Sequence, residues 1–160
     1  MNIINKYGNY IIHNPNYKER VLDFLERQFF IKHIGIELTE ILPGNTRCRL
    51  KVEEIHKQQH GFLHGGVIAT MADVVAGCAA YTLVHEDHHV VTGEIKISYL
   101  NPGTGPNLLA VGWVLKQGRK INSSNFVRSI FCPFVASKGN LLIITSDSLG
   151  MVISNHRETK

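Results

Sequence analysis

The sequence predicts an α+β fold in which a curved antiparallel sheet wraps around one long central helix. Residues 67–83 are almost all apolar or small and leave no polar face at helical spacing, which is typical of a helix buried on every side. Two segments before this helix and three or four after it read as strands. With only one substantial helix, a sheet curved around that helix is the most economical way to build the core.

The chain is long enough for one domain, because 160 residues with 44% apolar composition can form a core. We divide it into an N-terminal segment (1–32), a sheet-and-helix domain (33–153) and a solvated tail (154–160). Residues 1–13 show no clear period. Asn14 and Pro15 then predict the start of a short amphipathic surface helix through about Phe30, since Asn is a common N-cap and Pro is favoured in the first turn.

The strands follow from alternation and from turn residues. Before the central helix, two alternating segments are separated by a Pro-Gly-Asn turn at 43–45; they are residues 34–38 and 46–52. After it, residues 91–100 alternate, and residues 108–115 are apolar on both faces, as in the interior of a sheet. Further strands are predicted after turns at 117–120 and 138–140; they are residues 126–135, 141–146 and, as a candidate, 149–153. This arrangement is the hotdog fold.

Composition limits the function. The net charge of +4 comes from scattered residues without a run of Lys and Arg, which argues against nucleic acid and fits a small polyanionic ligand. Three cysteines without a CxxC pair indicate a reducing compartment. The N-terminus does not resemble a signal peptide and no apolar stretch resembles a membrane span, so we expect a cytoplasmic protein without a membrane partner.

Four segments carry a family resemblance: HGG at 64–66, an acid nine positions after the His at Asp73, TGEIKISYLNPG at 92–103 and VLKQGRK at 114–120. Over about residues 33–153 the sequence resembles the hotdog-fold acyl-CoA thioesterases of the phenylacetate-degradation and 4-hydroxybenzoyl-CoA type. The resemblance implies a hydrolase of acyl- or aryl-CoA that works as a homodimer or dimer of dimers. It implies no metal and no cofactor other than the coenzyme A of the substrate. Gly77 departs from the family, where relatives often place Thr or Ser.

Thioester hydrolysis needs a polarised carbonyl and an attacking oxygen. The amides of Gly65 and Gly66, at the start of the long helix, suit a carbonyl oxygen that gains negative charge, and the side-chain amide of Gln58 could add a donor. Gly65 and Asp73 are eight residues apart, or about 12 Å along one helix, so one carbonyl cannot touch both. If both act on one thioester, they come from two chains of a two-fold dimer.

We assign Asp73 as general base or nucleophile, a choice that the sequence leaves open. The alternative is a structural acid that binds backbone amides. His64 either orients the loop and Gln58 or contacts the thioester oxygen, and both readings stay open.

The resemblance also implies substrate contacts around the carbonyl and along the coenzyme A nucleotide. Thr92 matches a family position that faces the acyl site, although a strand Thr can equally serve packing. Cations beside a glycine turn could bind phosphates, or could form a solvated hairpin end. The predicted substrate-binding residues are Gly66, Thr92, Asn101, Lys116, Gly118, Arg119 and Lys120.

Residues 85–89 spell HEDHH, a literal HExxH zinc-protease signature. That chemistry needs both His on one face of a helix, whereas here the helix has ended and a strand follows at once, so we predict a polar loop. Three functions remain. The first is an acyl-CoA thioesterase, and the second is a non-catalytic acyl-CoA binding protein, an alternative that remains because Gly77 replaces a hydroxyl residue. The third is a hotdog dehydratase or hydratase, which the single acid after HGG disfavours.

Overall fold

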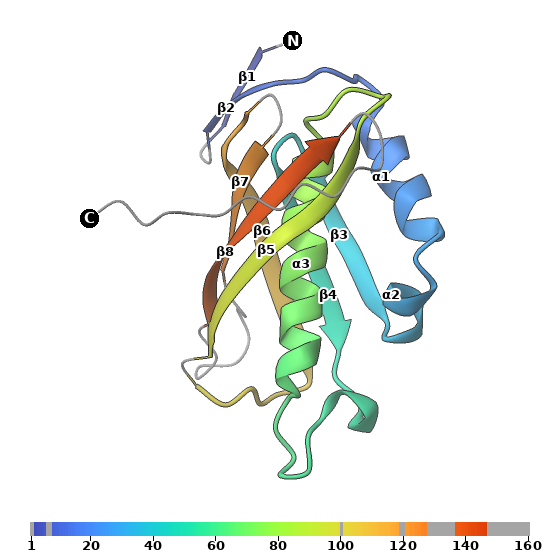
Figure 1. Cartoon of the computed structure of the whole chain (residues 1–160). Coiled ribbons are helices and arrows are strands. Elements are labelled where there is room, and N and C mark those ends of the chain that lie inside the picture. The colour runs from blue at the N-terminus through green and yellow to red at the C-terminus, as the bar shows by residue number, and fades with distance from the viewer. Residues whose placement is uncertain (1, 6–7, 100, 119–120, 128–136, 147–160) are drawn as a thin grey trace, which may run out of the picture.

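The computed structural model describes residues 2–5, 8–99, 101–118, 121–127 and 137–146, and it confirms the hotdog fold. A six-stranded antiparallel sheet in the order β3-β4-β6-β7-β8-β5 curves around one long helix, α3 (Gly65–Tyr81) (Figure 1). Its strands are β3 (Ile36–Leu42), β4 (Asn45–Lys51), β5 (His89–Tyr99), β6 (Asn107–Lys116), β7 (Ile121–Val127) and β8 (Ser137–Ser146). The predicted interior strand is β6, which pairs with β4 and β7.

The central helix lies close to the sheet because both surfaces are built from small residues. Val75, Ala76 and Ala79 are fully buried. A Cβ added to Gly112 on β6 would lie 2.6 Å from the Val75 carbonyl, so only glycine fits there. The Thr46 hydroxyl on β4 donates to the same carbonyl at 2.6 Å. These contacts fix the position of α3 in the sheet, and with it the residues that α3 carries.

The N-terminal segment contains more structure than the sequence predicted. A two-stranded sheet, β1 (Asn2–Asn5) and β2 (Gly8–Ile11), precedes two helices, α1 (Tyr17–Glu26) and α2 (Phe29–His33). The single helix predicted from Asn14 through Phe30 is therefore wrong at its start and its end. Asn14 lies before the helix, where its side-chain oxygen accepts from the Asn16 N–H at 2.8 Å, and this local bond ends the extended segment.

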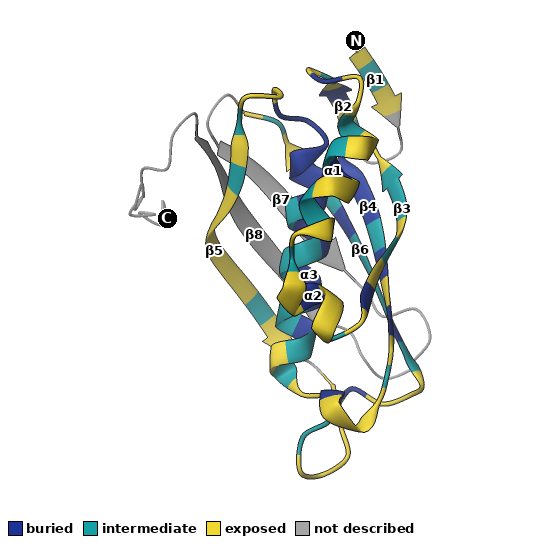
Figure 2. Cartoon of the chain, turned by 90° about the vertical axis from the view of Figure 1, so that its right-hand side faces the viewer, coloured by how far each residue is buried: buried dark blue, intermediate teal, exposed yellow. Residues whose placement is uncertain are grey.

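Figure 2 shows α1 and α2 lying over α3, between β5 and β3, where the curved sheet is open. Val21 of α1 is fully buried against Cys78 and Tyr81 of α3, which holds α1 on the central helix. The extended segment before α1 is held separately. The Tyr10 hydroxyl donates to the Val114 carbonyl at 2.6 Å, and the Gln117 side-chain amide bonds both the N–H and the carbonyl of Ile11 at 2.8 Å.

The C-terminal strands differ from the prediction in where they begin and end. Strand β7 begins at Ile121 instead of residue 126. The predicted turn at 138–140 is wrong, because these residues lie inside β8, where Asn140 pairs with Lys96 and Asn125. The long antiparallel ladders on both sides of β8 override the local turn preference of Gly and Asn. Residues 128–135 and 149–153, where the sequence predicted strand, lie outside the described residues.

Candidate active site

The start of α3 presents one backbone donor. His64 is the N-cap, with φ −67° and ψ 132°, and its Nδ1 accepts from the Gly66 N–H at 2.9 Å. The prediction that both glycine amides are free therefore holds only for Gly65, whose N–H meets no acceptor among the described residues. The bond places the His64 ring as a helix cap, with its proton on Nε2. The Tyr99 hydroxyl donates to the Gly65 carbonyl at 2.9 Å and ties β5 to this helix start.

Gln58 lies in a tight loop before α3. Its backbone N–H donates to the Phe62 carbonyl at 2.8 Å, and its side-chain Oε1 accepts from the His60 N–H at 3.0 Å. Because the oxygen is occupied, the side-chain Nε2 is left as the donor. Gln58, Gly65 and Asn101 line one open cavity of about 410 Å³. This cavity can receive a carbonyl oxygen, with the Gly65 N–H and the Gln58 Nε2 as donors.

Asp73 lies two turns further along α3 and is half-buried. Its Oδ1 accepts from the Thr92 hydroxyl at 2.6 Å. Thr92 lies on β5 at a β-bulge, where the pairing with β8 shifts between Thr92 and Glu94. A bulge re-aims the side chains beside it, and here it accompanies a Thr hydroxyl turned toward the acid. The sequence signal for this pair is a glycine inside a strand, Gly93, which is typical of a bulge.

A second cavity, of about 230 Å³, is lined by Asp73, Thr92 and Gly77 together with Gln28 and apolar side chains. Cys78 lines it too. Burial, with a smaller contribution from the charge of Asp73, raises the pKa of the Cys78 thiol to about 12. The thiol is therefore neutral at physiological pH and serves as a small apolar wall.

The two cavities have no lining residue in common. Helix α3 is continuous from Gly65 to Tyr81, so Gly65 and Asp73 are about 12 Å apart along its axis. One chain thus carries two candidate half-sites: the Gly65 and Gln58 donors at the start of α3, and a carboxylate with its hydroxyl partner in the middle.

The predicted phosphate-binding turn lies at the other end of α3. Lys116 is the last residue of β6, and the next residue, Gln117, donates through Nε2 to the Leu83 carbonyl at 3.2 Å. Since α3 has 17 residues and extends about 25 Å, Lys116 and Gly118 are far from the Gly65 cavity of their own chain. Arg119 and Lys120 lie outside the described residues.

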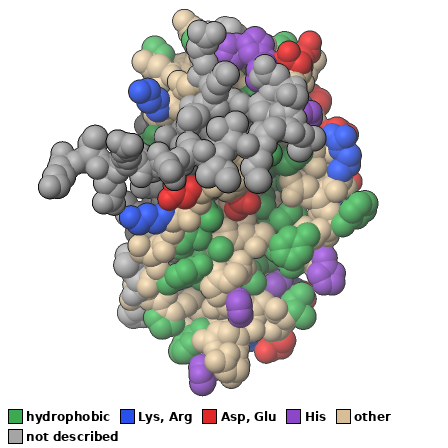
Figure 3. All heavy atoms as spheres, viewed as in Figure 1, with side chains coloured by type: hydrophobic (Ala, Val, Ile, Leu, Met, Phe, Trp, Pro, Cys, Tyr) green, Lys and Arg blue, Asp and Glu red, His purple; other side chains and the backbone are tan. Residues whose placement is uncertain are grey.

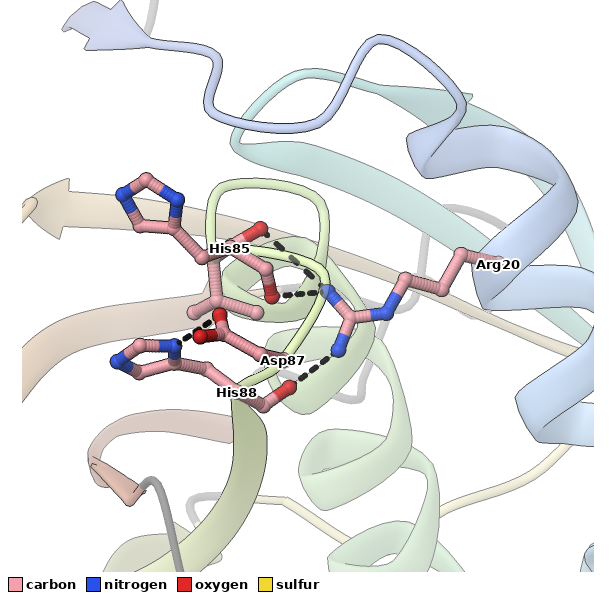
Figure 4. A network of polar contacts seen from close by, with 5 residues as sticks. Arg20, His85, Asp87 and His88 are labelled. Atoms are coloured by element: carbon pink, nitrogen blue, oxygen red, sulfur yellow. Dashed lines mark hydrogen bonds and ion pairs between the residues drawn. The ribbon is translucent and has the colours of Figure 1, made fainter.

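The HExxH sequence forms a loop, as predicted. Helix α3 ends at Tyr81 and β5 begins at His89. Figure 4 shows Arg20 of α1 reaching across to this loop, where its guanidinium donates to the carbonyls of His85, at 2.5 Å, and His88. A bond from the His88 ring lowers the pKa of the Asp87 carboxyl. The described residues hold no cluster of three or more His, Cys, Asp or Glu side chains with metal-binding geometry.

Comparison with known proteins shows similarity to thioesterases. Residues 60–122 match the model of the Thioesterase superfamily. Human acyl-coenzyme A thioesterase 13 is 33% identical over 87 residues, which are 54% of this chain and 61% of the human protein. The match thus spans about three fifths of that relative. In the described part of the chain, no helix is both long and apolar enough to cross a membrane.

Solved structures confirm the fold over most of the chain. A thioesterase family protein from Silicibacter pomeroyi is 27% identical with a TM-score of 0.76, over 81% of this chain and 97% of that one. The Escherichia coli PaaI protein, from the phenylacetic acid degradation operon, is 18% identical with a TM-score of 0.72, over 80% of this chain and 91% of that one.

Proposed function

The chain has the hotdog fold and its residues 60–122 match the Thioesterase superfamily, and on these grounds we propose that it hydrolyses acyl- or aryl-coenzyme A to the free acid and coenzyme A. One observation carries the proposal. A single helix presents an unoccupied amide at its start and a hydroxyl-bound carboxylate in its middle, which are the two groups that thioester hydrolysis requires. The name of the human relative, acyl-coenzyme A thioesterase 13, supports the same substrate class.

The reaction uses the two half-sites from two subunits. The Gly65 N–H and the Gln58 Nε2 donate to the thioester carbonyl oxygen and stabilise the negative charge that develops on it. The partner's Asp73 either takes a proton from the attacking water or attacks the carbonyl carbon itself. When Asp73 acts as the base, water adds to the carbonyl carbon, the carbon–sulfur bond breaks and the sulfur leaves as coenzyme A with the proton that Asp73 took from the water. When Asp73 attacks, the carbon–sulfur bond breaks to leave an anhydride between the acyl group and Asp73, and water then hydrolyses this anhydride to the free acid and supplies the proton of the thiol. The Thr92 hydroxyl holds Asp73 Oδ1, so Oδ2 is the oxygen available for the reaction.

A homodimer is proposed because the site is incomplete in one chain. Strand β5 is an edge of the sheet over 11 residues. Its side chains Val91, Ile95 and Tyr99 are 46%, 38% and 53% exposed. Figure 3 shows hydrophobic side chains spread over the face formed by α3 and β5. A long edge strand with exposed apolar side chains favours pairing with a second copy, and such dimers can pair again into tetramers.

We assign the coenzyme A phosphates to the turn after β6, through Lys116, Gly118, Arg119 and Lys120. Charge-assisted bonds from cations are the strongest contacts available to phosphates. Along α3, the described part of this turn lies nearer to Asp73 than to Gly65. The subunit that supplies the acid is therefore the one expected to bind the nucleotide.

The test begins with release of free thiol from a panel of acyl-CoAs by wild-type protein and by Asp73→Asn. Wild-type turnover that Asp73→Asn loses is the expected result. Equal rates in the two proteins would remove Asp73 from the mechanism. A wild type that binds acyl-CoA tightly in calorimetry without releasing thiol would instead support a non-catalytic binding protein, which the missing hydroxyl at Gly77 keeps as the alternative.

The shared site is tested by mixing two inactive variants. Gly65→Pro replaces the amide hydrogen with a ring carbon, and its Cβ would lie 3.4 Å from the Tyr99 ring. The helix should tolerate it, because proline is favoured at the first helical position and the His64 backbone already has the extended conformation found before proline. In equal mixtures with Asp73→Asn, half of the dimers are mixed and each has one intact site. About a quarter of the wild-type activity should return. Mixed dimers without activity would contradict the shared site.

Localisation to the cytoplasm is part of the proposal. Cys48 and Cys78 are free and buried thiols, and burial raises the pKa of the Cys48 thiol well above its usual value. Unpaired buried cysteines are usual in a reducing compartment. Fractionation of the native host cells, with antibody detection, tests this assignment.

A further inference from the structure

A cavity of about 230 Å³ adjoins Asp73. It lies between α1, α3 and β5, and its walls away from the acid are mainly apolar: Phe24 from α1, Val74, Cys78 and Tyr81 from α3, and Val90 from β5. Gln28, which follows α1, is the polar side chain in these walls. Asp73, Gly77 and Tyr81 follow each other at one-turn spacing and so share one face of α3. The cavity therefore extends along the helix from the carboxylate toward Tyr81.

Its far wall is a pair of aromatic rings. The rings of Phe24 and Tyr81 lie 4.9 Å apart between centroids, at an angle of 39°. The Arg20 guanidinium lies over the Tyr81 ring, 4.3 Å from its centroid, and is held in turn by the loop carbonyls shown in Figure 4. Aromatic pairs and cation–π contacts each favour one geometry. The wall is thus fixed from both sides, and one half of it comes from the N-terminal helix.

The width of the cavity depends on Gly77. A Cβ built at this position meets no atom within 4 Å, so the residue borders open space. Any larger side chain one turn from Asp73 would extend into that space. Gly77 therefore lacks not only the hydroxyl of a Thr or Ser but also the volume of a side chain. The space that it leaves open lies where the acyl chain would extend away from the reacting carbonyl.

From this geometry, and resting on the proposed thioesterase function, we infer that the cavity binds the acyl group, that Phe24 of the N-terminal helix limits its length and that Gly77 sets its width. The volume of about 230 Å³ is smaller than the roughly 300–1,000 Å³ of pockets for drug-sized ligands. It therefore fits a compact apolar acyl group, a six-carbon chain or a single ring, and excludes a long fatty chain. This assigns the N-terminal segment a role in substrate choice.

The experiment compares kcat/KM for acetyl-, hexanoyl-, benzoyl- and myristoyl-CoA. The variants are Phe24→Ala, which removes half of the end wall, Phe24→Leu as a milder change, and Gly77→Leu, which narrows the cavity with a good helix former. Leu22→Ala is the matched control, because Leu22 lies on the same helix and is 51% exposed. Thermal unfolding of each variant shows whether it is folded.

Wild type should prefer hexanoyl- and benzoyl-CoA. Removing a wall that excludes a chain should change discrimination by about tenfold or more. Phe24→Ala should raise the ratio of kcat/KM for myristoyl-CoA to kcat/KM for hexanoyl-CoA by this factor, and the ratio for Phe24→Leu should lie between those of Phe24→Ala and wild type. Gly77→Leu should lower the benzoyl-to-acetyl ratio by a similar factor, and Leu22→Ala should leave both ratios unchanged.

Two failures are distinguishable. If wild type releases no thiol from any substrate, the proposed function fails and the inference fails with it. If wild type is active but Phe24→Ala and Gly77→Leu keep its ratios, or if wild type prefers myristoyl-CoA, the acyl pocket is wrong while the thioesterase proposal stands. A poorly folded Phe24→Ala still leaves Gly77→Leu decisive, because the space at Gly77 is open.

Discussion

The hydrogen bond from Thr92 to Asp73 gives the most direct test of the reaction geometry. Thr92→Val keeps the shape of the side chain and removes only the hydroxyl that donates to Asp73 Oδ1 at 2.6 Å. Hydrogen bonds to charged groups are worth about 1.5–3 kcal/mol, and water can replace part of this one because Thr92 is exposed. We therefore expect a loss of about 1.4 kcal/mol of transition-state stabilisation, or about tenfold in kcat/KM.

The test is a double-mutant cycle measured by release of free thiol. Asp73→Asn alone should cost about 10²–10⁴-fold, the usual contribution of a general base. Thr92→Val should then cost nothing further in the Asp73→Asn background, since the hydroxyl acts through the carboxylate. Thr92→Ser restores the donor and should regain most of the wild-type rate.

Two results would refute this reasoning. One is a tenfold loss from Thr92→Val in both backgrounds, which would mean that Thr92 acts independently of Asp73. The other is Thr92→Ser as slow as Thr92→Val, which would make the role of Thr92 one of packing, the alternative raised by its position on a strand.

Three further predictions concern stability and reactivity. Gly112→Ala should lower the free energy of unfolding in urea by about 1–3 kcal/mol, because its Cβ would lie 2.6 Å from the backbone of α3, whereas Gly77→Ala, with open space around it, should not destabilise. Cys78, with its pKa near 12, should resist iodoacetamide at pH 8 in the folded protein and react quickly in urea. Burial, and then the neighbouring His85, lower the pKa of His13 below 6.5, so its packing stabilises the segment above pH 6.5 and this stability is lost as the pH falls through the lowered pKa. Hydrogen-exchange protection factors over residues 8–16, corrected for the intrinsic exchange rate at each pH, should therefore fall between pH 7.5 and pH 5, and should fall less in His13→Gln.

The parts of the fold that the sequence predicted are those with a local pattern. Two patterns are visible without tertiary information: the all-apolar stretch around α3 and the alternation in β3, β4 and β5. They are visible because burial on all sides, or on one face, determines the spacing of apolar residues along the chain. The separation of Gly65 and Asp73 followed in the same way, since the distance between two residues on one helix is fixed by its rise.

The parts that the sequence did not predict depend on contacts between distant segments. The Thr92–Asp73 bond joins residues 19 positions apart and requires the bulge at Gly93. The Gly66 amide is occupied because the His64 ring folds back onto it, which residue types alone do not require. The cavity beside Asp73 needs Phe24 to reach Tyr81 across 57 positions, a contact that only the docking of α1 provides.

The docking of Tyr10 has a practical consequence for protein engineering. A Cβ at Gly44, which has φ +67°, would lie 2.6 Å from the Tyr10 ring, so the phenol fills a hollow that exists only because residue 44 is glycine. A shortened version trimmed to residue 33 onward would leave that hollow empty and strip the Val114 carbonyl of its donor. Expression clones meant for crystallisation should therefore start no later than Gly8, and affinity tags are better separated from that residue by a spacer.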